Sequence, residues 1–171
     1  MGGGGRATMT LTLRPTAPAD IPALHRLMRD FAAYEKLVHR FRITEAGLHD
    51  VLFSLHPALD SILAEVGTTP VGFALWYFTF GTFSGRWGLF VEDIYVAPAH
   101  RGRGIGLALF RHMARIALAR DCASMDWNVL DWNAPAIAFY RRLGAKPVEG
   151  WIPQQLGGDA LAALAQGAGN G

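Results

Sequence analysis

Three glycines in alternate positions, Gly102, Gly104 and Gly106, stand where a predicted strand ends and a long predicted helix begins. Glycine carries no side chain, so the backbone here can turn tightly and aim successive N–H groups at one point in front of the helix. Arg101 and Arg103 lie in the same segment, and a helix N-terminus carries partial positive charge. The segment therefore predicts a strand-to-helix junction that binds a pyrophosphate. A flexible turn without a ligand is the alternative.

Neither of the two common phosphate-binding patterns fits this segment. A P-loop places lysine directly after its last glycine, and here Leu107 follows Gly106. A dinucleotide fingerprint follows the first strand of a βαβ unit, whereas this segment follows the fourth predicted strand of an antiparallel run. The ligand is therefore expected to be a different diphosphate.

The hydrophobic periodicity predicts a mixed α/β chain. Pro15 and Pro18 end the first strand, and Gly144 ends a late helix. Pro153 cannot donate a hydrogen bond to a sheet, so the last strand is expected at an edge or with a bulge. The predicted elements are, in order, strand 10–14, helix 20–35, helix 44–56, antiparallel strands 61–66, 71–80 and 87–96, helix 104–121, strand 124–129, helix 134–143 and strand 146–156.

Length and composition predict one folded domain. The chain has 171 residues, of which 51% are hydrophobic and 18% charged, and this excludes intrinsic disorder for its body. The glycine-rich ends, 1–9 and 166–171, are expected to be flexible, which leaves a single domain at 10–165. The longest apolar stretch, 71–80, is about half as long as a membrane-spanning helix. Cys122 is a single cysteine and no secretory signal is recognised, so a cytoplasmic protein without a membrane partner is expected.

The charge of the chain matters locally rather than globally. A net charge of +2 is too weak to predict a nucleic-acid partner. However, the stretch 94–120 contains five arginines and no acid, which favours a local anion site. The histidines follow none of the usual metal-ligand spacings, so no metal is predicted.

The glycine-rich segment, written Arg101-Gly102-Arg103-Gly104-Ile105-Gly106, resembles the acetyl-CoA pyrophosphate loop of the GNAT N-acetyltransferases. Further motifs over residues 10–165 resemble the spermidine/spermine and thialysine branch of that family: Val91-Glu92-Asp93-Ile94-Tyr95-Val96, Trp127 with Asp131-Trp132-Asn133, and Ala138-Phe139-Tyr140 with Leu143-Gly144-Ala145. The resemblance implies an α/β (α+β, GNAT) fold with a mixed, largely antiparallel central sheet. Helices would flank both faces, and the sheet would splay between strands four and five, with the pantetheine arm of acetyl-CoA in the gap.

The resemblance also implies which residues bind acetyl-CoA, the expected cosubstrate. Backbone groups of Ile94, Tyr95 and Val96 would pair with pantetheine like an added strand. Asn133 matches a further cofactor contact. The pyrophosphate would be held by Arg101, Gly102, Arg103, Gly104, Ile105, Gly106 and Leu107.

Acetyl transfer needs a base and an acid. A primary amine has a reference pKa near 10.4 and arrives protonated, so a carboxylate must take its proton before the nitrogen attacks. Glu92 and Asp93 are neighbours on a strand, which places them on opposite faces, and Glu92 matches the proposed base of the family. Tyr140 matches the acid that protonates the leaving thiolate. The alternatives are a structural partner to an arginine or to a backbone amide for Glu92, and a core position for Tyr140.

A cationic substrate requires acids around it. The family's amine site, partly supplied by the second subunit of a homodimer, matches Tyr34, Glu35, Glu92, Asp93, Glu149 and Trp151. Glu35 and Glu149 can equally be ordinary surface carboxylates. His39, Arg40 and Arg42 depart from the acidic pocket expected for a long polycation, which disfavours spermidine and spermine.

The predicted function is acetyl-CoA-dependent N-acetylation of a small primary amine by direct attack on the thioester. The amine would be a diamine or polyamine, thialysine or a lysine-like compound, or another small amine. The alternative from a different class is a CoA-binding sensor without turnover, which needs neither Glu92 nor Tyr140.

Overall fold

The computed structural model describes residues 10–167. The predicted leader 1–9 and the last residues of the predicted tail, 168–171, lie outside the described residues. The chain divides into two compact units, residues 1–130 and 131–171, and the predicted single domain spans both.

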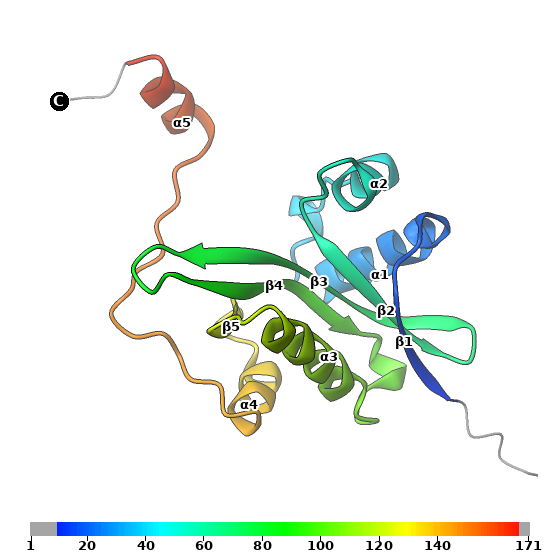
Figure 1. Cartoon of the computed structure of the whole chain (residues 1–171). Helices are drawn as coiled ribbons and strands as arrows, with labels where there is room; N and C mark the ends of the chain where they lie inside the picture. The colour runs from blue at the N-terminus through cyan, green and yellow to red at the C-terminus, as the bar shows by residue number, and fades with distance from the viewer. Residues whose placement is uncertain (1–9, 168–171) are drawn as a thin grey trace, which may run out of the picture. The chain divides into compact units, whose positions relative to one another are not determined.

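The first unit contains one sheet and three long helices (Figure 1). The strands lie in the order β1-β2-β3-β4-β5, with β4 and β5 parallel and the other neighbours antiparallel. This confirms the mixed, largely antiparallel sheet. The elements are β1 (Leu11–Pro15), α1 (Ile21–Tyr34), α2 (Glu45–Phe53), β2 (Asp60–Val66), β3 (Thr69–Gly81), β4 (Arg86–Val96), α3 (Ile105–Ala119) and β5 (Ser124–Trp127), close to the predicted ranges.

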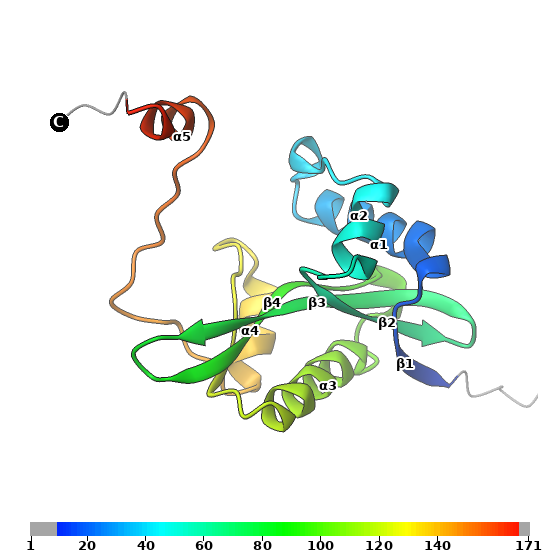
Figure 2. The ribbon, with the colours of Figure 1, turned by 45° about the horizontal axis from the view of Figure 1, so that its top comes forward.

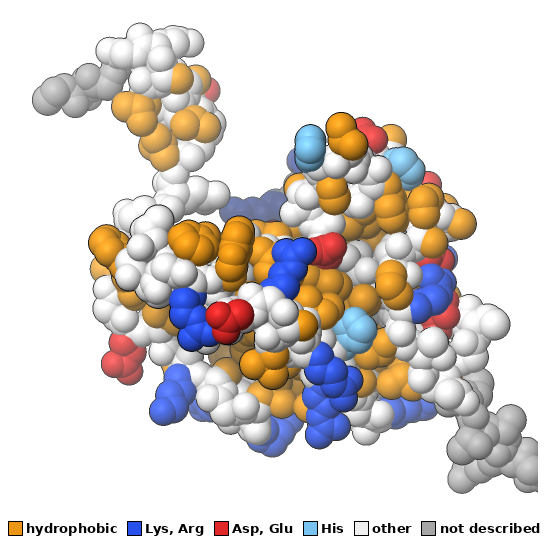
Figure 3. Space-filling model, viewed as in Figure 1, with side chains coloured by type: hydrophobic (Ala, Val, Ile, Leu, Met, Phe, Trp, Pro, Cys, Tyr) orange, Lys and Arg blue, Asp and Glu red, His pale blue; other side chains and the backbone are white. Residues whose placement is uncertain are grey.

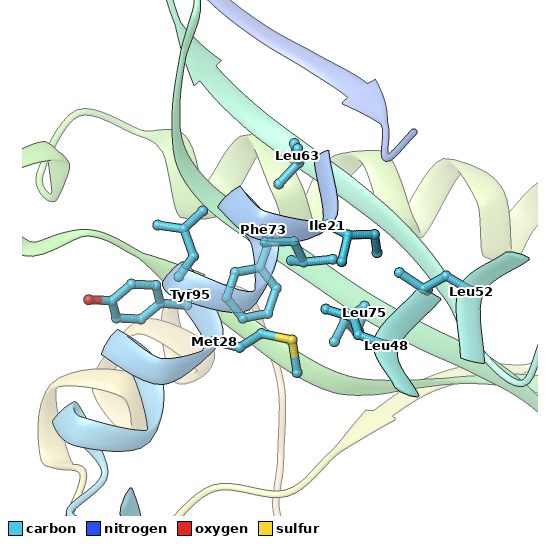
Figure 4. Packing of buried hydrophobic residues seen from close by; sticks show 10 residues of the cluster. Ile21, Met28, Leu48, Leu52, Leu63, Phe73, Leu75 and Tyr95 are labelled. Carbon is cyan, nitrogen blue, oxygen red and sulfur yellow. The ribbon is translucent and has the colours of Figure 1, made fainter. Parts of the chain in front are cut away.

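The helices cover both faces of this sheet, as predicted. Figures 1 and 2 show α1 and α2 on one face and α3 on the other. The side chains that α1 buries recur at helical spacing, which is why the segment folds as an amphipathic helix. They pack with α2 and with the inward side chains of the strands in a cluster that includes Met28, Leu48, Phe73, Leu75 and Tyr95 (Figure 4).

Arg14 ties the start of the first unit together. Its guanidinium donates to Asp20 at 2.6 Å and to Glu65 at 2.6 Å, which joins β1, β2 and the entry of α1. The hydrogen bonds from Arg14 lower the pKa of Asp20. The carboxylate of Asp20 also accepts from the backbone N–H of Ala17 at 2.8 Å, which fixes the turn before α1.

The sheet opens between β4 and β5, as predicted. Their parallel pairing covers only four residue pairs, from Gly88 with Ser124 to Val91 with Trp127. Beyond this point β4 continues to Val96 with β3 as its only strand partner among the described residues. The second half of β4 therefore has one edge that faces a gap.

The second unit differs from the sequence prediction at its end. It contains α4 (Ala134–Arg142) and α5 (Gly158–Ala165), and Gly144 ends α4 with a φ of 89°, as expected. The strand predicted at 146–156 is wrong, because residues 143–157 form no strand. Pro147 and Pro153 donate no backbone hydrogen bond, and no neighbouring strand pairs with this segment in the described chain. The helix α5 was not predicted.

Candidate active site

Glu92 occupies a β-bulge in β4. The register pairs Leu75 with Asp93 and Trp76 with Val91, so Glu92 is an extra residue with no partner on β3. A bulge interrupts the alternation of side chains along a strand. The expectation that Glu92 and Asp93 lie on opposite faces therefore fails at this point. The bulge directly follows Val91, the last residue of β4 that pairs with β5.

The bulge brings negative charges together on the face covered by α1. Asp93 pairs with Leu75, whose side chain belongs to the core cluster beneath α1 and α2. Burial, and then the charges of Glu92 and Glu35, raise the pKa of Asp93 to about 7. Burial also raises the pKa of Glu35, which follows the last residue of α1. Three of the predicted substrate-binding acids thus form one interacting group, called here the acid cluster (Glu35, Glu92 and Asp93).

Tyr77 is a neighbour of the acid cluster that the sequence analysis missed. Burial and the charge of Glu92 raise the pKa of its phenol, so the hydroxyl lies within electrostatic reach of that carboxylate. Its ring packs on Phe90 with centroids 5.2 Å apart. In the sequence Tyr77 is one aromatic among several in an apolar strand, and only the position of the bulge identifies it.

The free edge of β4 offers peptide groups to the gap. The N–H of Ala97 donates to Val71 at 2.8 Å, and the carbonyl of Tyr95 lies against Gly72, where an added Cβ would be 2.7 Å away. Both Tyr95 and Ala97 therefore direct their peptide groups toward β3. Because successive residues of a strand alternate in this respect, Ile94 and Val96 direct theirs toward the gap. These groups fit an extended pantetheine arm, whereas Tyr95 offers none to it.

The glycine-rich segment forms the N-terminus of α3. Gly102 and Gly104 have φ angles of 73° and 78°, a left-handed conformation that favours glycine. Ala108 donates to Gly104 at 2.9 Å, so it makes the first bond of the helix and the preceding N–H groups of Ile105, Gly106 and Leu107 lie before it. Such amides, at the positive end of a helix dipole, fit a pyrophosphate.

The surroundings of this helix are cationic. Arg103 is exposed, as are the other arginines of the stretch 94–120. Figure 3 shows Lys and Arg side chains along the side of the first unit on which α3 lies. The guanidinium of Arg101 is directed toward β4 and the end of α1 instead. Its Nε donates to the carbonyl of Val96 at 2.8 Å, and its Cζ lies 4.4 Å from the ring centroid of Tyr34.

The remaining predicted site residues belong to the second unit. Asn133 is buried, and its side-chain oxygen accepts from the N–H of Ala136 at 3.3 Å, so it caps α4. Tyr140 is half-buried on α4, and its ring packs on that of Phe139 with centroids 5.6 Å apart. Glu149 and Trp151 are exposed in the irregular segment 143–157.

Within residues 10–167 no group of three His, Cys, Asp or Glu side chains is arranged to hold a metal ion. Nor is any helix in this range long and apolar enough to cross a membrane.

Comparison with known proteins places the chain in one family. Residues 21–145 match the acetyltransferase (GNAT) family. The chain belongs to this family, whose members use acetyl-CoA as cosubstrate, and it is an amine N-acetyltransferase.

Individual relatives agree with this assignment. The thialysine N-epsilon-acetyltransferase of Mus musculus is 35% identical over 90% of this chain and 96% of its own length. The L-ornithine N5-acetyltransferase of Arabidopsis thaliana is 27% identical over 89% of this chain and 86% of its own. Among solved structures, an integron cassette protein from the mobile metagenome of V. cholerae is similar, with a TM-score of 0.78 and 25% identity over 92% of this chain and 99% of that one. The family and the branch predicted from the motifs are thus confirmed.

Proposed function

We propose that the chain acetylates the side-chain amine of a small basic amino acid of the thialysine or lysine type. The observation that carries the proposal is the acid cluster at the bulge of β4, directly beside the peptide groups of Ile94 that face the gap. A cationic amine held by these carboxylates lies next to the edge to which we assign pantetheine.

The chemistry then follows from the protonation states. Acetyl-CoA supplies the thioester whose acetyl group is transferred. Glu92, directly or through a water molecule, accepts the proton that the ammonium loses, and the free nitrogen attacks the thioester carbonyl carbon. A C–N bond forms, the C–S bond breaks, and Tyr140 donates its proton to the leaving sulfur. The nitrogen loses its second proton to solvent as the amide forms, and solvent returns a proton to the phenolate of Tyr140. The assignments of Glu92 and Tyr140 rest on the bulge and on the family motif respectively.

The amino-acid class is favoured by the charges that follow Glu35. The segment 36–42 contains Lys36, His39, Arg40 and Arg42 and no acid. Phe41 attaches this segment to α1, because its ring packs on that of His25 with centroids 5.2 Å apart. A cationic segment beside an acid cluster suits a substrate with an ammonium at one end and a carboxylate at the other. Spermidine and spermine carry only positive charges, so we expect them to be poorer substrates. The names of the mouse and Arabidopsis relatives support the same class.

The cosubstrate groups are assigned by the same reasoning. We propose that Ile94 and Val96 pair with pantetheine, with Tyr95 between them, and that the amides of residues 102–107 hold the pyrophosphate together with Arg103. Asn133, which caps α4, would supply a further contact to the cosubstrate. No metal is required by this mechanism.

We further propose a cytoplasmic homodimer. Val148, Trp151 and Ile152 expose 69%, 77% and 82% of their surfaces, an apolar segment that a second copy would cover. Glu149 and Trp151 would then approach the amine site of the partner. Light scattering tests this proposal, since Trp151→Glu should convert a dimer into a monomer, and a monomeric wild type would contradict it.

The decisive experiment measures thiol release from acetyl-CoA with thialysine, lysine, ornithine, putrescine, spermidine and spermine. We expect turnover with the amino acids and kcat/KM for spermine lower by on the order of 10-fold or more. Higher activity with the polyamines would contradict the assigned substrate class. Tight CoA binding with no turnover on any amine would favour the CoA-binding sensor instead.

A further inference from the structure

Arg101 belongs to the glycine-rich segment, yet its side chain is directed away from the helix N-terminus. Its Nε donates to the carbonyl of Val96 at 2.8 Å. Its Cζ lies 4.4 Å from the ring centroid of Tyr34 and 5.6 Å from that of Tyr95, so the guanidinium faces two aromatic rings. Such cation–π contacts stabilise an arginine in one place.

The two tyrosines come from different elements of the first unit. Tyr34 is the last residue of α1, and Tyr95 lies in β4. Tyr95 is anchored, because it is buried and its ring packs on Phe31 at 5.6 Å and on Phe73 at 6.2 Å. Figure 4 shows its hydroxyl pointing away from the other labelled side chains of the core. Burial raises the pKa of this hydroxyl, and Arg101 opposes the rise.

Both tyrosines stand beside members of the acid cluster. Glu35 directly follows Tyr34, and Asp93 precedes Tyr95 by two residues on β4. A contact that holds Tyr34 near Tyr95 therefore also fixes Glu35 relative to Asp93. The charge of Glu35 already affects the pKa of Asp93, so the two groups are electrostatically coupled in this arrangement.

We propose that Arg101 is a positioning residue of the amine site rather than a ligand of the pyrophosphate. It joins the end of α1 to β4 through the rings of Tyr34 and Tyr95 and through the Val96 carbonyl. The proposal rests on the proposed function, which assigns the acid cluster to the amine. It also has a consequence for the gap, because Arg101 occupies the Val96 carbonyl and leaves the Val96 N–H and both peptide groups of Ile94 for pantetheine.

The test compares Arg101→Lys with Arg26→Lys, a matched control at an exposed position of α1. Both variants keep the positive charge, but Arg101→Lys loses the planar group that spans two rings and a carbonyl. With thialysine as substrate we expect Arg101→Lys to raise the amine KM on the order of 10-fold and to change the Kd of CoA less than about threefold. Arg26→Lys should leave the amine KM unchanged. Loss of CoA affinity in Arg101→Lys with an unchanged amine KM would overturn the proposal in favour of a phosphate ligand.

A double-mutant cycle with Tyr34→Leu measures the coupling between the two residues, which a general loss of stability would not produce. Because Arg101 acts on Glu35 through Tyr34, the effects of the two substitutions on the amine KM should be strongly non-additive. Additive effects would overturn the coupling. If Arg101→Lys folds poorly, as thermal unfolding would reveal, Arg101→Gln replaces it, since its amide retains planar N–H donors.

Amide hydrogen exchange separates this proposal from the proposed function. In Arg101→Lys, exchange should accelerate in residues 31–37, at the end of α1, and remain unchanged at the start of α3. This expectation holds whether or not the wild type acetylates thialysine. If the wild type does not acetylate thialysine, only the proposed function is contradicted. Unchanged exchange in residues 31–37 would refute the positioning role.

Discussion

The carboxylates of Glu92 and Asp93 interact across a bulge in β4, and the charge of Glu92 helps to raise the pKa of Asp93 to about 7. Burial of Asp93 is the larger cause. A largely buried acid that is half protonated near neutral pH is costly to ionise in the folded protein. Such a group is retained where a cation is to be bound, because a bound ammonium stabilises the ionised form.

Asp93→Asn should make the protein more stable in neutral and alkaline solution. The pKa of Asp93 is higher in the folded than in the unfolded chain, so the folded state holds more protons between about pH 4 and pH 7, and stability falls as the pH rises through this window. We expect the variant to gain about 4 kcal/mol in the free energy of unfolding at pH 8 and almost nothing at pH 4.

Urea unfolding at the two pH values measures this difference. Asp50→Asn, at an exposed position of α2, is the matched control and should leave the pH dependence unchanged. An equal gain at both pH values would mean that packing, not ionisation, is responsible. Asp93→Asn should also raise the KM for thialysine, since the amine loses a carboxylate that binds it.

Tyr140→Phe should separate catalysis from cosubstrate binding. The substitution removes only the hydroxyl proposed to protonate the leaving sulfur, and the contact of its ring with Phe139 is retained. We expect kcat to fall on the order of 100-fold while the Kd of CoA stays within about twofold. Steady-state turnover and calorimetry give the two quantities, and Phe139→Leu serves as a control for packing on α4. An unchanged kcat would remove Tyr140 from the mechanism.

Arg103→Glu should weaken the binding of CoA. The side chain is exposed beside the N-terminus of α3, and a carboxylate there would repel the phosphates. We expect the Kd of CoA to rise on the order of 10-fold at low ionic strength, and the effect to shrink at high salt because screening is stronger. Arg26→Glu, exposed on α1 at the other face of the sheet, makes the same change of charge as a control. If Arg103→Glu binds CoA like the wild type, only the amides of the loop matter.

The sequence alone predicted most of the first unit, because its signals are local. Apolar spacing located α1, and the alternate glycines located the start of α3 within one residue. The end of β5 was placed two residues too late, since a strand ends where its partner stops pairing, and β4 leaves β5 after Val91. The strand prediction at 146–156 was wrong for the same reason, because its apolar side chains resemble those of a strand but no strand lies beside them in the described chain.

The acid cluster was predicted residue by residue from the family motif, but its geometry was not. Val91-Glu92-Asp93-Ile94 gives no sign that alternation is broken, because a bulge is a relation between two strands. Arg101 was assigned to the phosphate from its place in the motif, while the structure directs it to Tyr34. The side chain of arginine is long, so the groups that it contacts cannot be read from its position in the sequence.

Gly104→Ala tests whether the left-handed turn before α3 is required for cosubstrate binding. Its φ of 78° is unfavourable for alanine, although an added Cβ would meet no atom within 4 Å. The cost is therefore strain alone, about 1–2 kcal/mol, and the loop can relieve it by turning its amides away from the ligand. We expect the Kd of CoA to rise about 10-fold with little change in Tm.

Gly47→Ala provides the contrast on α2. Gly47 lies inside that helix, and its added Cβ would lie 3.4 Å from the hydroxyl oxygen of Thr44 and 3.7 Å from the side chain of Ile43. Alanine there should stabilise the protein by about 0.5–1 kcal/mol and leave CoA binding unchanged. Calorimetry and thermal unfolding of both variants complete the test. If Gly104→Ala lowers Tm by several degrees and binds CoA normally, the left-handed turn serves the fold of α3 and not the pyrophosphate.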